Sequence, residues 1–137
     1  MSEVVKNRPR FGVMRLADAV VGGYRLPLAG FVSILHRISG MLMFLLLPFI
    51  LYLLDNSLTS EISFAVFQQI TSGVFAKLVI LALVWAFLHH FCAGMRHLLM
   101  DLHVGLDKDS ARKSAVGVLA VSLALSAAVA LKLFGVF

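Results

Sequence analysis

Three long apolar segments alternate with polar segments along the chain. They run from about Leu28 to Leu54, from about Gly73 to Leu99, and from about Ala115 to the C-terminus. A membrane-spanning helix needs roughly 20 apolar residues, so each segment is long enough to cross a bilayer. The pattern predicts an all-α integral membrane protein with three transmembrane helices.

The composition excludes a soluble globular protein. The chain has 137 residues, of which 61% are hydrophobic and 14% are charged, too few polar residues to cover a water-soluble surface. The single cysteine, Cys92, excludes an internal disulfide and a covalent Cys-x-x-Cys-His haem attachment. The basic N-terminal segment is not followed by a short apolar core and a cleavage site, so we expect no secretory signal.

The basic residues predict the orientation in the membrane. The formal net charge is +5, and Lys and Arg cluster before the first apolar segment and between the second and third. The loop 55–72 contains neither. Because basic loops stay in the cytoplasm, we expect a cytoplasmic N-terminus. Residues 1–27, with a turn at Gly22-Gly23 and Pro27, form a cytoplasmic or interfacial segment, and residues 28–137 form the membrane domain.

Several local signals refine this outline. The loop 55–72 fits a short interfacial helix and a coil equally well. The loop 107–113 is a solvated connector with a helix cap before the third span. Pro48 predicts a bend in the first span. Small residues at four-residue spacing predict a helix-packing face in the third span: Ser122, Ser126 and Ala130.

The first span carries one polar stripe. Ser33, His36, Arg37 and Gly40 follow the spacing i, i+3, i+4 and i+7, which puts them on one helix face. The hydroxyl and guanidinium suit a quinone carbonyl that gains negative charge on reduction. The alternative for Arg37 is snorkelling to the lipid headgroups.

The second span carries a matching stripe. His90, Gly94, His97 and Asp101 follow the spacing i, i+4, i+7 and i+11, and Gly94 leaves space in which a flat ligand could lie beside His90. A neutral imidazole in an apolar setting suits an axial haem ligand, and packing against a neighbouring helix is the alternative. His89 points about 100° away.

The two stripes lie at the same depth. At 1.5 Å per residue, His36 and His90 are both about 13 Å from the cytoplasmic ends of their helices, so the stripes can meet in the inner half of the bilayer. His97, Asp101 and His103 imitate a metal site only loosely, because Arg96 adds positive charge beside them and the helix end explains their polarity.

The two stripes resemble the signatures of a known family. The segment Ser33-Ile34-Leu35-His36-Arg37-Ile38-Ser39-Gly40, preceded by Tyr24-Arg25-Leu26-Pro27, resembles the first signature of the cytochrome b subunit of succinate dehydrogenase. Residues 90–101 resemble the second signature, H-x-x-x-G-x-R-H-L-x-x-D. Arg8-Pro9 matches an Arg-Pro near the family's N-terminus, whereas residues 10–23 depart from the family pattern.

The resemblance implies a role for each polar residue. His90 falls on the axial ligand of haem b, and His36 lies near the haem propionates. Ser33 and Arg37 fall on the quinone site. His97 is placed in the vicinity of the haem. The second axial histidine is expected from a partner anchor subunit, with His36 as the weaker alternative.

The resemblance also implies a function and partners. The chain is expected to be the membrane anchor of succinate:quinone oxidoreductase, a non-flavin subunit with no complete active site of its own. Electrons from succinate pass through a flavoprotein and an iron–sulfur subunit to a quinone, linking the tricarboxylic acid cycle to the respiratory chain. A second small membrane anchor completes the complex, in a bacterial cytoplasmic (inner) membrane. The alternatives are a non-redox membrane scaffold and a stand-alone b-type cytochrome.

Overall fold

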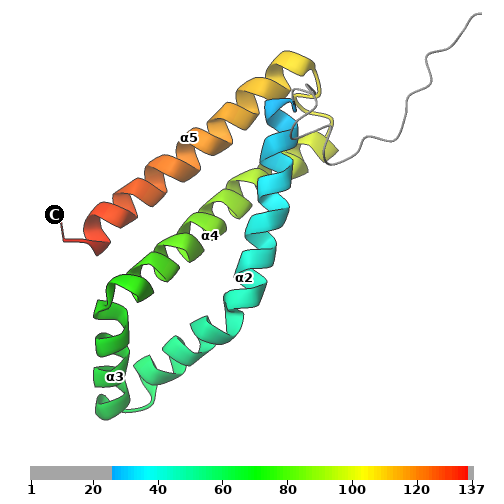
Figure 1. Cartoon of the computed structure of the whole chain (residues 1–137). Coiled ribbons are helices and arrows are strands. Elements are labelled where there is room, and N and C mark those ends of the chain that lie inside the picture. The colour runs from blue at the N-terminus through cyan, green and yellow to red at the C-terminus, as the bar shows by residue number, and fades with distance from the viewer. Residues whose placement is uncertain (1–25, 136–137) are drawn as a thin grey trace, which may run out of the picture.

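Residues 26–135, the part of the chain that the computed structural model describes, fold into four helices (Figure 1). They are α2 (Leu28–Leu58), α3 (Glu61–Ser72), α4 (Val74–Asp101) and α5 (Lys108–Leu133), and no strand occurs within this range. Helices α2, α4 and α5 are long and apolar enough to cross a membrane, which confirms the all-α prediction with three spans. The turn at Gly22-Gly23 and the Arg8-Pro9 match lie outside the described residues.

Short polar segments set the helix boundaries. The loop after the first span is helical, because Ser60 and Ser63 form a capping box at the start of α3. The Ser60 hydroxyl accepts a hydrogen bond from the Ser63 amide, and the Ser60 amide donates to the Ser63 hydroxyl. The third span begins at Lys108, before the predicted Ala115, since Asp107 caps it. The amide of Ser110 donates to the Asp107 carboxylate at 2.9 Å, and this bond lowers the pKa of Asp107.

The three long helices meet at one end of the bundle, where α2 begins, α4 ends and α5 begins. We call this the convergent end. Figure 1 shows α2 crossing α4 near this end and diverging from it farther along, before the last part of α2, the helix that contains Pro48, bends toward α3. The small core belongs to all three spans: Val32, Ala93, Ala115 and Val118. Elsewhere large apolar side chains are exposed, Phe44 at 75% for example, so their surroundings must be lipid or protein.

A buried histidine joins the three spans. His89 is fully buried, stacks on Trp85 and places Nδ1 3.4 Å from Ser122 Oγ on α5, while it also lies near the backbone of Val32 on α2. Its Nε2 is buried without a hydrogen-bond partner. Ser122 and Ser126 are buried, as the predicted packing face requires, and they allow α5 to approach the histidine closely.

A buried arginine fixes the turn between α4 and α5. Arg96 is 5% exposed, and its Nε donates to Ser114 Oγ at 2.9 Å. Its Nη2 donates to the Ala111 carbonyl at 3.4 Å. Because the Arg96 guanidinium donates to these two groups of α5, it holds the start of α5 against α4.

We expect His89→Ala to destabilise the bundle mainly through lost packing. Truncating a large buried side chain costs about 2–5 kcal/mol, whereas a hydrogen bond between membrane helices contributes about 0.6 kcal/mol on average. A double-mutant cycle with Ser122→Ala, followed by unfolding in detergent, separates the two. The expected coupling is below about 1.7 kcal/mol. A coupling that accounts for the whole loss would contradict this assignment.

Candidate functional site

The two polar stripes face each other between α2 and α4. The rings of His36 and His90 stack with their centroids 4.1 Å apart and their planes at 20°. His97, nearly two turns along α4, tilts against His36 with a centroid distance of 5.1 Å. The predicted meeting of the stripes is therefore present, and it forms a cluster of three imidazoles, which we call the histidine cluster.

One backbone carbonyl fixes the orientation of His90. The Nδ1 of His90 lies 3.0 Å from the carbonyl oxygen of His36 and 3.4 Å from Ser39 Oγ. The Ser39 hydroxyl donates to the same carbonyl at 2.8 Å. Because a carbonyl only accepts, Nδ1 carries the proton in this contact, and in the neutral ring Nε2 then carries the free lone pair. The protein thus selects the tautomer in which Nε2 of His90 can bind a metal.

Glycines make room for the two rings, in an arrangement that differs from the prediction. A Cβ added at Gly40 would lie 2.9 Å from His90 Cε1 and 3.2 Å from His90 Nδ1, closer than side chains pack. A Cβ at Gly94 would lie 3.6 Å from His36 Nε2. The space over Gly94, which the sequence assigned to a flat ligand, is therefore occupied by the His36 ring, since two helices in contact fill such a gap with side chains.

The remaining stripe residues lie around this cluster. Ser33 is half-buried and Arg37, one turn further along α2, is exposed. Asp101 is also exposed and does not join the histidines. Within residues 26–135 no group of three or more His, Cys, Asp or Glu side chains is arranged to hold a metal ion. A metal in this part of the chain would therefore need a ligand set completed from outside it.

Sequence reasoning missed Ser39 and the structural part of His89. Ser39 is fully buried and contacts both the His36 carbonyl and His90. Ser39 follows His36 by three residues, a spacing that puts both on one helix face, and this was the signal in the sequence that could have identified it. His89 points away from the histidine cluster, as predicted, but its burial against α5 depends on how the helices pack and is not visible in the sequence.

Together, the fold and the site define a membrane protein of several spans with an intramembrane histidine cluster shared between two of them. Residues 14–129 match the family model described as the succinate dehydrogenase/fumarate reductase transmembrane subunit. The chain belongs to this family.

Two curated relatives are similar to most of the chain. The succinate dehydrogenase cytochrome b556 subunit of Paracoccus denitrificans is 34% identical over 103 residues, which cover 75% of this chain and 79% of the relative. The protein of the same name from Coxiella burnetii (strain RSA 493 / Nine Mile phase I) is 37% identical over 100 residues, covering 72% and 80%.

Replacement of Gly40 by Ala should displace His90, and Gly117→Ala is the matched control. Each change gains up to about 1 kcal/mol of helix propensity, but a Cβ at Gly117 meets nothing within 4 Å. Overpacking at Gly40 costs about 1–3 kcal/mol. Unfolding in detergent should therefore show Gly117→Ala at or above the parent stability and Gly40→Ala below it. Equal behaviour of the two variants would mean that His90 does not rest against Gly40.

Proposed function

We propose that this chain is the haem- and quinone-binding cytochrome b anchor of a succinate:quinone oxidoreductase. It binds haem b through His90 and holds a quinone near Ser33 and Arg37. The quinone receives the electrons that come from succinate. The observation that carries the proposal is the 3.0 Å contact of His90 Nδ1 with the His36 carbonyl, which leaves Nε2 as the nitrogen available to a metal.

The surroundings of His90 fit an axial haem ligand. Metal-binding histidines in proteins almost always donate their second ring N–H to a carbonyl, carboxylate or water, and His90 donates to the His36 carbonyl. His90 is also half-buried on a face that the chain leaves partly open. A haem bound there would supply one-electron redox chemistry, while the chain supplies the ligand and its orientation. The relatives' name, cytochrome b556 subunit, supports the same reading.

The geometry of His36 favours a second axial ligand from another subunit. If His36 and His90 held the same iron, each would have to direct a ring nitrogen at it. The rings of His36 and His90 instead lie face to face, 4.1 Å apart, with no room for an iron between them. We therefore assign the second histidine to a partner anchor subunit and place His36 and His97 near the haem propionates, which imidazole N–H groups can hold.

Ser33 and Arg37 are assigned to the quinone. They lie one turn apart on α2, at the level of the histidine cluster, and Arg37 is exposed. Burying a charged side chain at the centre of a bilayer costs roughly 2.5–3.5 kcal/mol or more. The exposed guanidinium of Arg37 therefore needs a polar or anionic partner. A quinone carbonyl provides one, because its oxygen gains negative charge on reduction; Arg37 stabilises that charge and Ser33 donates a hydrogen bond.

The rest of the complex supplies the other steps. A flavoprotein subunit oxidises succinate, an iron–sulfur subunit passes the electrons on, and a second small anchor packs against the exposed faces of α2 and α4. With the N-terminus and the loop 102–107 in the cytoplasm, the convergent end and its histidine cluster are the part of the chain nearest to the soluble subunits. The bacterial relatives are consistent with a location in the inner membrane.

We expect His90→Ala to remove the haem. The reduced-minus-oxidised visible spectrum of the complex, purified in mild detergent, should show a b-type signal in the parent and none in this variant. His103→Ala is the matched control, because His103 lies exposed after the end of α4. A full b-type signal in the variant, with flavin content unchanged, would contradict the assignment. Haem without any flavin in the parent would instead favour a stand-alone cytochrome.

We expect Arg37→Ala to impair quinone reduction selectively. Loss of one donor to a developing negative charge costs about 10²-fold in rate. Succinate oxidation by an artificial dye, which takes electrons before the quinone site, should persist. Arg37→Lys should retain part of the quinone activity because it keeps the charge. Normal quinone turnover in Arg37→Ala, together with no haem in the parent, would favour the non-redox scaffold.

A further inference from the structure

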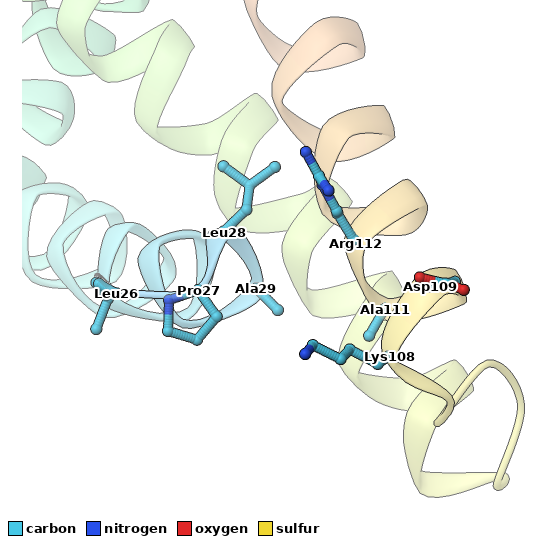
Figure 2. A pocket seen from close by; sticks show the side chains of 8 residues that line it. All are labelled: Leu26, Pro27, Leu28, Ala29, Lys108, Asp109, Ala111 and Arg112. Carbon is cyan, nitrogen blue, oxygen red and sulfur yellow. The ribbon is translucent and has the colours of Figure 1, made fainter. Parts of the chain in front are cut away.

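A cavity lies at the convergent end, at the edge of the bundle. It has a volume of about 710 Å³, within the range of roughly 300–1,000 Å³ that is usual for ligand sites. One wall is the segment 26–29 at the start of α2, and the other is the first turns of α5. Figure 2 shows the Lys108 side chain extending from α5 toward the start of α2, with Arg112 one turn further along α5.

The walls of this cavity differ in chemistry. Leu26, Pro27, Leu28 and Ala29 make one wall apolar. The α5 wall carries the ammonium of Lys108 and the guanidinium of Arg112, with Asp109 as its one carboxylate. The cavity therefore has an excess of positive charge beside an apolar surface.

Neighbouring groups shift this balance in both directions. Asp107 precedes Lys108 and stays negatively charged, because the bond from the Ser110 amide lowers its pKa, but its carboxylate is turned to the start of α5 and does not line the cavity. Helix α2 begins without a side-chain cap, so its first amide groups add positive potential at the cavity.

The cavity also lies at the depth of lipid headgroups. Both walls are the first turns of helices that continue as apolar spans, α2 from Leu28 and α5 from Lys108. Basic pockets between spans at a cytoplasmic surface are suited to anionic lipids, because the cations reach the phosphate while the apolar wall continues toward the acyl chains. A carboxylate of a soluble protein would use the cations but not the apolar wall.

We propose that this cavity binds the headgroup of an anionic phospholipid, with its phosphate between Lys108 and Arg112 and its glycerol backbone against residues 26–29. The site is separate from the histidine cluster and does not depend on haem or quinone binding, although its test uses the complex proposed above. It anchors the start of α2 to the start of α5 through a lipid.

Native mass spectrometry of the intact complex tests the proposal. Phosphatidylglycerol and phosphatidylcholine are titrated into delipidated complex in detergent. One phosphatidylglycerol should bind more tightly than any phosphatidylcholine. Each basic residue near a membrane surface contributes about 1 kcal/mol, so Lys108→Gln/Arg112→Gln should weaken this binding about 30-fold. The control pair Lys113→Gln/Lys132→Gln removes the same charge outside the cavity and should leave the affinity unchanged.

Three results would overturn the proposal. Equal weakening by the control pair would mean that a diffuse positive field attracts the lipid. Displacement of phosphatidylglycerol by inorganic phosphate at similar concentration would mean a free-anion site. Binding that appears only after the soluble subunits are removed would mean that a protein segment fills the cavity.

A measurement on the unsubstituted complex covers the case in which the double variant fails to assemble. Phosphatidylglycerol with a photoreactive headgroup should label residues 26–29 or 108–112. Labelling confined to other segments would contradict the site.

Discussion

The contact between the His36 carbonyl and the His90 imidazole is the interaction on which the histidine cluster depends. It joins α2 to α4, and it selects the tautomer of His90 through an acceptor that cannot change its protonation state. The stacked ring of His36 covers the other side of the imidazole. One residue thus contributes a main-chain and a side-chain contact, so any shift in the register of α2 against α4 would remove both.

Close approach of the helices makes this contact possible, and small residues permit the approach. Gly40 leaves space for the His90 ring, and the fully buried Ser39 hydroxyl satisfies the same carbonyl. On the opposite face of α4, the small residue Ser122 of α5 lets that helix come close to His89, whose Nδ1 lies 3.4 Å from the Ser122 hydroxyl. Without the hydrophobic effect to drive spans together, packing and hydrogen bonds must hold them, which explains why α2, α4 and α5 converge where these residues occur and why α2 leaves α4 beyond them.

Periodicity predicted the three spans and the meeting of the two stripes, because hydrophobic length and residue spacing are properties of single helices. Periodicity did not predict how the His36 and His90 rings fill the space between α2 and α4. Gly94 lies beside His36 and Gly40 beside His90, an exchange that depends on the rotation and register of one helix against the other. The same holds for His89 and Arg96, whose burial follows from the position of α5. The start of α5 was misplaced because its first turn is charged, although the cap at Asp107 was visible in the sequence.

The exposed faces of the chain follow the same physical logic. Arg37 is exposed on a membrane helix, and Phe44 and Phe75 are exposed at 75% and 81%. An apolar side chain can be covered by lipid at little cost, whereas a guanidinium at this depth cannot. A neighbouring subunit that brings polar groups to α2 would therefore stabilise Arg37, and under the function proposed above the same subunit would supply the second histidine. Under the proposed function, the quinone and the haem would therefore share one interface and not occupy two separate sites.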